Sequence, residues 1–152
     1  MVGEASAQDD TAPYTDAVIR ETLRLRPPVT AIPWLLREPC DIGGHHVPAG
    51  TFAVASLWDL HRNPALYPGP EAFRPERFLR SRPPRGAWLP FGTGSHACIG
   101  GQPAFIQVKL LIHTLLRRGQ LRPATDRDEG IRHRCSTEVY PAQGCRVTLR
   151  LS

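Results

Sequence analysis

Residues 90–100 of the chain read PFGTGSHACIG, and this stretch decides the fold. Gly92 and Gly94 permit a tight path with positive φ, which brings backbone amides close to the side chain of Cys98. An apolar pattern of helical period follows, so the cysteine lies where a helix starts. The partial positive charge of a helix N-terminus favours the thiolate form of a cysteine. The stretch therefore predicts a thiolate that serves as a nucleophile or as a metal ligand.

The residues alone leave alternatives open for Cys98. A cysteine in an arbitrary position is more often a small buried residue than a functional one. A cysteine nucleophile needs a general base, and His96 is only two residues away, with no Asn or Asp that can be assigned as its partner. The glycine-rich loop favours the metal-ligand interpretation.

The same stretch resembles the heme-binding signature of the cytochrome P-450 superfamily, Phe-Gly-x-Gly-x-[Arg/His]-x-Cys-x-Gly. Its specified positions are filled by Phe91, Gly92, Gly94, His96, Cys98 and Gly100. The resemblance implies heme as the cofactor and Cys98 as the axial iron ligand, with Phe91 packed near it and His96 as a donor to a heme propionate. A thiolate ligand pushes electron density onto the iron and favours cleavage of an O–O bond.

Two further segments resemble the family in the expected order. Glu21 and Arg24 fit its Glu-x-x-Arg helix, and residues 73–78, FRPERF, resemble the segment that supplies a second arginine. The resemblance implies a structural triad of Glu21, Arg24 and Arg77. Taken alone, a Glu–Arg pair at i,i+3 is usually solvated and contributes a few tenths of a kcal/mol.

Periodicity and turn residues predict the elements. We expect a helix over residues 14–25, ended by Pro27-Pro28, and a second helix over residues 99–118. Apolar runs at residues 29–36 and 51–57 flank a turn-rich segment, and together they indicate two or three short strands with tight turns. An alternating strand closes the chain after a charged loop. Proline-rich residues 61–90 show no period, so an irregular segment is expected there.

The resemblance implies an α+β, mainly α, fold that is the C-terminal heme-binding part of a larger one. It comprises two main helices, small antiparallel sheets, an irregular meander and the cysteine loop. Residues 1–12 are predicted to be a flexible tail, and residues 13–152 the heme-ligating part. Residues 29–33 are expected beside the heme, where they would shape a substrate pocket, although a plain core strand fits their composition equally well.

The chain departs from the family pattern in several places. Trp34 or Leu35 falls where an arginine often binds a propionate, with Arg37 slightly displaced. Pro103 interrupts the expected start of the second helix, and Gln107 replaces an acid. His61, in an ordinary context, is interpreted as a structural histidine rather than a ligand.

Composition excludes several other classes. The net charge is +5 and only Lys109 among the basic residues is lysine, but the arginines are scattered and no nucleic-acid module accompanies them. The four cysteines form no C-x-x-C pair, which argues against a zinc ribbon. No apolar run reaches the length of a transmembrane helix, so we expect no membrane segment in this chain. The arginine-rich composition and the lack of an anchor favour a bacterial, cytoplasmic protein.

The function implied by the resemblance is that of a heme-thiolate monooxygenase, which hydroxylates a small organic substrate with electrons from a ferredoxin or flavoprotein reductase. Segments for proton delivery and for covering the distal heme face are missing, so the fragment is expected to be inactive alone and to expose apolar surface. A separate distal half is then a further expected partner. Two alternatives stay open: a heme-binding or heme-sensing module without catalysis, and a non-functional product that folds poorly.

Overall fold

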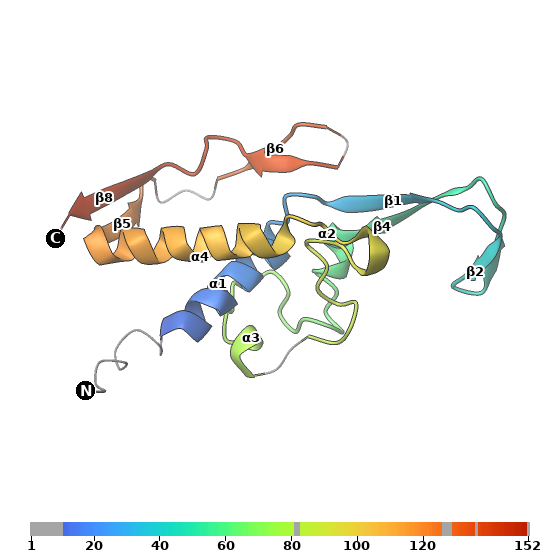
Figure 1. The fold of residues 1–152 in the computed structure, drawn as a ribbon, viewed down its shortest axis with the longest axis horizontal. Coiled ribbons are helices and arrows are strands. Elements are labelled where there is room, and N and C mark those ends of the chain that lie inside the picture. Colours follow the sequence, from blue (N-terminus) through green and yellow to red (C-terminus); the bar gives the residue numbers. More distant parts are fainter. Residues whose placement is uncertain (1–10, 81–82, 126–128, 136, 152) are drawn as a thin grey trace.

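The computed structural model describes residues 11–80, 83–125, 129–135 and 137–151. Its helices are α1 (Thr11–Leu25), α2 (Leu57–Leu60), α3 (Arg77–Arg80) and α4 (Gly101–Arg118), with a 3₁₀ turn η1 (Gly94–His96). Its strands are β1 (Ala31–Leu35), β2 (Cys40–Ile42), β3 (His45–Val47), β4 (Phe52–Ser56), β5 (Gly119–Pro123), β6 (Ile131–His133), β7 (Val139–Pro141) and β8 (Val147–Leu151). Two long helices with small antiparallel sheets confirm the expected architecture (Figure 1).

Helix α1 begins earlier than the sequence pattern indicated. Thr11 and Ala12, assigned to the predicted tail, belong to its first turn, and residues 1–10 of that tail lie outside the described residues. Pro13 falls in the first turn, where a missing N–H is tolerated. The helix ends at Leu25 before the two prolines, as predicted, and Arg62 donates a 2.6 Å hydrogen bond to the Leu25 carbonyl. That bond satisfies a carbonyl left free at the helix end.

The first strands form two antiparallel pairs. β1 pairs with β4 in the register Leu35↔Phe52, as the two apolar runs indicated. The segment predicted as turn-rich itself contains the β2–β3 hairpin, because Gly43 and Gly44 both take positive φ and close a two-residue turn. This hairpin extends away from the rest of the molecule (Figure 1).

The C-terminal region holds more strands than the sequence indicated. β8 is the predicted alternating strand, but it pairs with β5, and the expected loop contains the β6–β7 hairpin. Gly119 permits the first pairing, since a Cβ there would lie 2.0 Å from the Arg150 carbonyl oxygen. The hairpin also joins the segment after the two prolines, through a 2.8 Å bond from the Val139 N–H to the Pro28 carbonyl.

Helix α4 is shorter than predicted by two residues. It starts at Gly101, and Ile99 lies in the preceding loop with its side chain 98% exposed. Pro103 lies in the first turn, so it does not break the helix. Gly119 follows the last residue, as the arginine-rich end of the pattern indicated.

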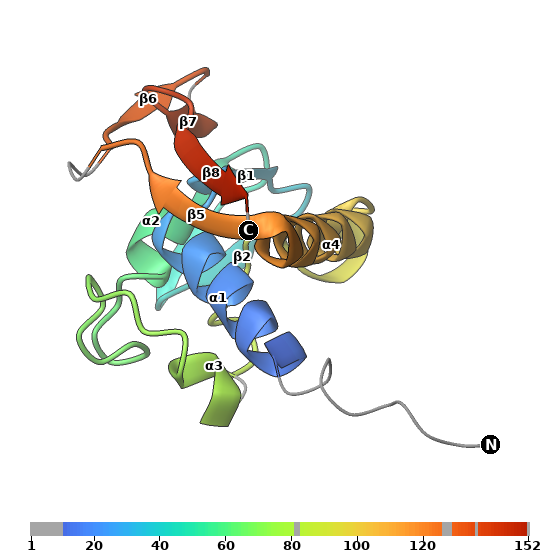
Figure 2. The ribbon, with the colours of Figure 1, turned by 90° about the vertical axis from the view of Figure 1, so that its left-hand side faces the viewer.

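The core lies where α1 meets the irregular segment after β4. Its largest fully buried side chains are Arg24, Leu57, His61, Glu21 and Pro27. Helix α1 contacts both α3 and α4, and Figure 2 shows it between them. The predicted absence of regular structure over residues 61–90 is confirmed, with α3 the only helix or strand among the described part of that range.

Candidate functional site

Cys98 stands in a tight loop between η1 and α4, with an exposed side chain. Its N–H donates a 2.7 Å hydrogen bond to the Phe91 carbonyl, and its own carbonyl accepts from the Gly101 N–H at 3.1 Å. Gly92 and Gly94 take φ values of 71° and 65°, as the sequence pattern required. The loop thus brings the predicted site residues together and presents the thiol at its outer surface.

Two glycines make room for this loop. A Cβ on Gly92 would lie 3.3 Å from the His96 carbonyl oxygen, so a side chain there would press on the turn. A Cβ on Gly101 would lie 3.0 Å from the Phe91 ring, which therefore rests against the first turn of α4. Sequence reasoning missed Gly101, which follows the last specified position of the motif.

The donor set suits an iron held by a macrocycle. Among the described residues no group of three or more His, Cys, Asp or Glu side chains could hold a metal ion. Cys98 instead offers a single free, exposed sulfur, and the Cβ position of Gly100 lies at an ordinary 3.8 Å from its Sγ. One protein thiolate with the remaining ligands supplied by a porphyrin is the ligation of heme-thiolate proteins. The residues present fit heme.

The other residues expected near the heme lie at different distances from the cysteine loop. His96 lies in η1 and is exposed. Ile32 of β1 reaches the loop, with its Cδ1 4.0 Å from the Cβ position of Gly92, so the segment expected beside the heme does adjoin Cys98's loop. Arg37 lies beyond β1 and is exposed.

A chain of aromatic side chains packs against Phe91 of the cysteine loop. The rings of Phe78 and Trp88 lie 6.2 Å apart and those of Trp88 and Phe91 6.3 Å apart, both edge to face. The Arg20 guanidinium lies 5.0 Å from the Trp88 ring centroid and 5.1 Å from that of Phe105 on α4. This set links α1, the meander and α4, and sequence reasoning missed it because its members are scattered along the chain.

The three residues of the predicted triad contact one another. Arg24 binds Glu21 through two hydrogen bonds of 2.8 and 2.9 Å, and both side chains are 0% exposed. Arg77 binds the same carboxylate at 3.1 Å. The alternative of a solvated helical pair is therefore wrong, because a second arginine and the meander enclose the pair.

The triad holds the meander through its backbone. Glu21 accepts from the Arg74 N–H at 2.8 Å, and Arg24 donates to the His61 carbonyl at 2.7 Å. Arg77 donates to the carbonyls of residues 68, 69 and 72. An irregular segment has few partners of its own, so these charged side chains supply the hydrogen bonds that a sheet or helix would give.

Tyr67 and His61 complete the cluster. The Tyr67 ring lies 5.1 Å from the Arg24 guanidinium, and its hydroxyl donates to the Ala87 carbonyl at 2.8 Å. Burial raises the pKa of Tyr67 to about 12, which keeps this donor protonated. Burial and the nearby Arg24 charge lower the pKa of His61 to about 4, so its ring is neutral near pH 7. His61 is structural in its contacts, as the sequence analysis had interpreted it.

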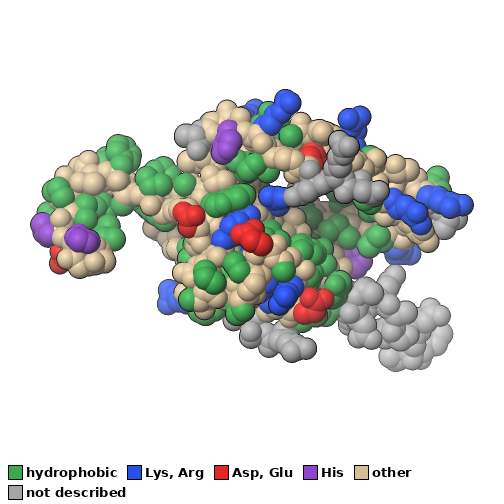
Figure 3. All heavy atoms as spheres, turned by 180° about the vertical axis from the view of Figure 1, so that it is seen from behind, with side chains coloured by type: hydrophobic (Ala, Val, Ile, Leu, Met, Phe, Trp, Pro, Cys, Tyr) green, Lys and Arg blue, Asp and Glu red, His purple; other side chains and the backbone are tan. Residues whose placement is uncertain are grey.

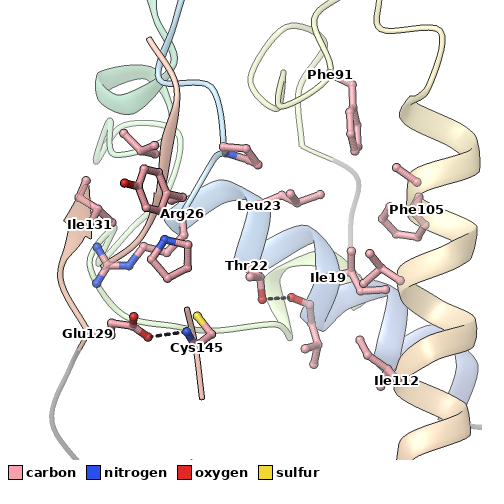
Figure 4. A pocket seen from close by; sticks show the side chains of 17 residues that line it. Ile19, Thr22, Leu23, Arg26, Phe91, Phe105, Ile112, Glu129, Ile131 and Cys145 are labelled. Atoms are coloured by element: carbon pink, nitrogen blue, oxygen red, sulfur yellow. Dashed lines mark hydrogen bonds between the residues drawn. The ribbon is translucent and has the colours of Figure 1, made fainter. Parts of the chain in front are cut away.

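An apolar groove of about 620 Å³ opens on the other side of α1. Leu23 and Ile19 of α1 and Phe105 and Ile112 of α4 point into it (Figure 4). The space-filling view shows hydrophobic side chains gathered in a hollow beneath the C-terminal strands (Figure 3). The groove was not anticipated in detail, although exposed apolar surface was.

The cytochrome P450 family model matches residues 6–141. The chain belongs to the cytochrome P450 family. A Mycobacterium tuberculosis protein assigned to this family under the name cytochrome P450 137 is 40% identical over 137 residues, which are 90% of this chain and 29% of that relative. Cyclooctat-9-en-7-ol 5-monooxygenase of Streptomyces melanosporofaciens is 46% identical over 113 residues, covering 72% of this chain and 25% of that enzyme.

A solved cytochrome P450 structure gives the same answer at the level of the fold. The retinoic acid-bound cyanobacterial CYP120A1 superposes with a TM-score of 0.79 and 31% identity, covering 92% of this chain and 33% of that one. The chain therefore spans about a third of the length of the cytochrome P450 structures and sequences it matches. Within the described residues, no helix of this cytochrome P450 chain is both long and apolar enough to cross a membrane.

Proposed function

We propose that this chain is the heme-ligating part of a heme-thiolate monooxygenase, with Cys98 as the axial ligand of the iron. The observation that carries the proposal is the exposed Cys98 thiol on a loop whose hydrogen bonds and glycines fix it at the start of α4. Heme bound there would supply the oxygen-activating chemistry of the family, and the chain's own residues would hold and orient it.

The loop residues would divide this work. Gly92 and Gly94 supply the positive φ values that the turn needs, the Cβ position of Gly100 lies 3.8 Å from the Cys98 sulfur, and Phe91 packs against Gly101. His96 is proposed as the donor to a heme propionate, since it is exposed on the 3₁₀ turn next to the ligand. Cys98 would hold the iron as a thiolate, which is its ligating form.

Glu21, Arg24 and Arg77 are proposed to be structural rather than catalytic. Their carboxylate and guanidinium groups are spent on one another and on meander carbonyls, so none is free to touch a reacting group. Their role is to fix the meander that leads to the cysteine loop.

Monooxygenase activity would require a covering part that is not among the described residues. Helix α4 exposes Leu110 and Leu111 at 61% and 58%, and contiguous exposed apolar side chains mark a surface that packs against other polypeptide. All sheets of the described chain are two-stranded, which are marginal without further packing. We propose that polypeptide equivalent to the rest of the family fold fills the groove, and that the chain without it does not hydroxylate substrate.

The remaining partners follow from the family. A ferredoxin or a flavoprotein reductase would supply electrons, and a small organic molecule would be the substrate. Residues 29–33 would contribute to its pocket, because Ile32 adjoins the cysteine loop. The arginine-rich composition and the mycobacterial and Streptomyces relatives support a bacterial, cytoplasmic protein.

A second candidate is a heme-binding or heme-sensing module without catalysis. It is favoured by one observation: the supports of the cysteine loop, Trp88, Phe91 and Gly101, all belong to this chain. The ligand loop can therefore form without a covering part, whereas the distal side of a pocket cannot.

An absorption spectrum tests the assignment of Cys98 as the heme ligand, which both candidates share. The purified chain is mixed with hemin, reduced and exposed to carbon monoxide, beside Cys98→Ser and a control, Cys135→Ser, at another exposed free cysteine. We expect a red-shifted thiolate-type Soret band that disappears only in Cys98→Ser. Such a band in the chain alone, without substrate hydroxylation, supports heme ligation by this part. A band indifferent to Cys98→Ser would overturn the assignment of the ligand.

A further inference from the structure

The approach to the cysteine loop has no strand partner. Residues 87–89 belong to no sheet, yet Ala87 is 3% exposed, so their backbone groups need partners from elsewhere. Side chains supply them: Tyr67 Oη donates to the Ala87 carbonyl, and the Leu89 N–H donates to His61 Nε2 at 3.1 Å. The Trp88 indole N–H in turn donates to the Arg20 carbonyl at 3.1 Å.

His61 is the member of this set that is held from both ends. Its side chain is 0% exposed, and its carbonyl accepts from Arg24 Nη1 at 2.7 Å. Since Nε2 accepts from Leu89, the ring proton is on Nδ1, which has no hydrogen-bond partner within the described residues. An unpartnered buried N–H costs free energy and does not hold the ring. The hydrogen bond from the Leu89 N–H to Nε2 is therefore the interaction that orients the ring.

A continuous hydrogen-bond path runs from this ring to the ligand. Leu89 donates to His61 and accepts, through its carbonyl, from the Gly92 N–H at 3.0 Å. The Phe91 carbonyl, which belongs to the same peptide group as the Gly92 N–H, accepts from the Cys98 N–H at 2.7 Å. The Glu21–Arg24 pair is thus connected to the backbone of Cys98 through His61.

We propose that His61 is a positioning residue of the cysteine loop, whose Nε2 acceptor fixes the Leu89 backbone and thereby the place of Cys98. The hydrogen-bond path stands on the geometry alone, whereas its consequence for heme rests on the proposed function. Arg24 and Arg62 are the charged groups nearest the ring, and Glu21 balances Arg24. Their positive charge disfavours an imidazolium, which would turn Nε2 into a donor facing the Leu89 N–H.

The test uses the ¹⁵N-labelled 152-residue chain and three variants. His61→Gln keeps an acceptor oxygen near the position of Nε2, and His61→Phe keeps a planar buried ring without an acceptor. His46→Phe is the matched control, because His46 is exposed on the β2–β3 hairpin. Ring ¹⁵N shifts report the tautomer of His61, and amide exchange reports the protection of Leu89, Gly92 and Cys98 against that of α1 and α4.

We expect an unprotonated Nε2 in the wild-type chain and protected amides at Leu89 and Cys98. His61→Phe should raise the exchange of these amides by about tenfold or more, as loss of one buried hydrogen bond implies, while α1 and α4 stay protected. His61→Gln should restore most of the protection. Equal acceleration in α1 and in the loop, or no acceleration in the loop, would show that His61 is only a core residue and overturn the proposal.

Two further outcomes are decisive without any variant. A protonated Nε2, or a wild-type Leu89 amide that exchanges as fast as an exposed turn, overturns the proposal even if His61→Phe does not fold.

Titration with hemin then separates this inference from the proposed function. A thiolate-type Soret band that is weakened or blue-shifted in His61→Phe and restored in His61→Gln supports both. Selective loss of loop protection without any heme band keeps the positioning role and shows that the chain alone does not bind heme.

Discussion

Helix α1 faces two regions that bury opposite kinds of side chain. On one side lies the meander cluster, defined by Glu21, Arg24, His61, Tyr67 and Arg77, in which the first three are 0% exposed. On the other side lies the α4 groove, an apolar hollow of about 620 Å³ beside a helix with several exposed leucines. Charged groups, which usually lie at the surface, are buried on one side of α1, and leucines of α4 are exposed on the other.

The difference shows what each kind of burial needs. A buried charge needs a few well-placed partners, and residues 61–77 of this chain provide all of them for Glu21 and Arg24. Apolar burial needs area, at roughly 25 cal/mol for each Å² removed from water, and the described part of the chain leaves Leu110 and Leu111 of α4 exposed. Among the described residues the meander cluster thus has its partners, whereas apolar side chains of α4 stay exposed.

The strongest way to break the comparison is to unpair the charges. Glu21→Gln leaves Arg24 buried and Arg77 nearly so without a carboxylate, and removal of one partner from a buried ion pair costs about 3–5 kcal/mol. Urea denaturation should show this loss, whereas Glu38→Gln, at an exposed site, should change the free energy of unfolding by less than about 0.5 kcal/mol. Equal effects of the two variants would mean that the cluster is not the stable part of the molecule.

Acid should weaken the same cluster through His61. The unfolded histidine has its usual pKa of 6.5 and the folded one about 4, so the unfolded chain binds the proton first as the pH falls. The stabilisation is complete above pH 6.5 and is lost as the pH falls toward 4, by up to about 3 kcal/mol. Urea unfolding between pH 7 and pH 4 should show a steeper loss of the free energy of unfolding in the wild-type chain than in His61→Gln, which has no titratable group at position 61. Parallel curves for the two proteins would rule out a buried neutral ring.

Gly101→Ala tests the junction between the cysteine loop and α4. Alanine normally stabilises a helix relative to glycine by about 1 kcal/mol, but here its Cβ would meet the Phe91 ring at 3.0 Å. We expect destabilisation by about 1–3 kcal/mol, the usual cost of overpacking. Gly130→Ala, whose Cβ would meet nothing within 4 Å, is the control. Thermal melts that show a gain in stability for Gly101→Ala would mean that the loop does not pack against α4.

The smallest effect on stability is expected on the open face of α4. Replacing both Leu110 and Leu111 by Glu should change the free energy of unfolding by less than about 0.5 kcal/mol, since both side chains are already solvated. The same change should lower self-association of the chain in sedimentation velocity, because it removes an exposed apolar patch. Gln107→Glu adds charge on the same helix without removing apolar surface and should leave association nearly unchanged. A large loss of stability in the double variant would show that this face is already buried in solution.

The sequence predicted the elements that carry a strong local signal. Pro27-Pro28 predicted the end of α1, and the helical period of apolar residues predicted α4. Of the four strands β1 to β4, two or three were predicted, and strands β5 to β7 were missed, because strands of three to five residues with mixed polarity leave almost no periodic pattern. Of these strands β5 has its partner far along the chain, in β8, whereas β2–β3 and β6–β7 are local hairpins.

The site divides in the same way. Residues 90–100 by themselves determined the glycine-permitted turn that carries Cys98 and the helix after it, because those features depend on local backbone conformation. The burial of Glu21 and Arg24, the stacking of Trp88, and the bond from Leu89 to His61 were decided only by the tertiary structure. These contacts join residues up to 68 positions apart, as between Trp88 and Arg20, and no local pattern encodes which distant partner satisfies a buried polar group.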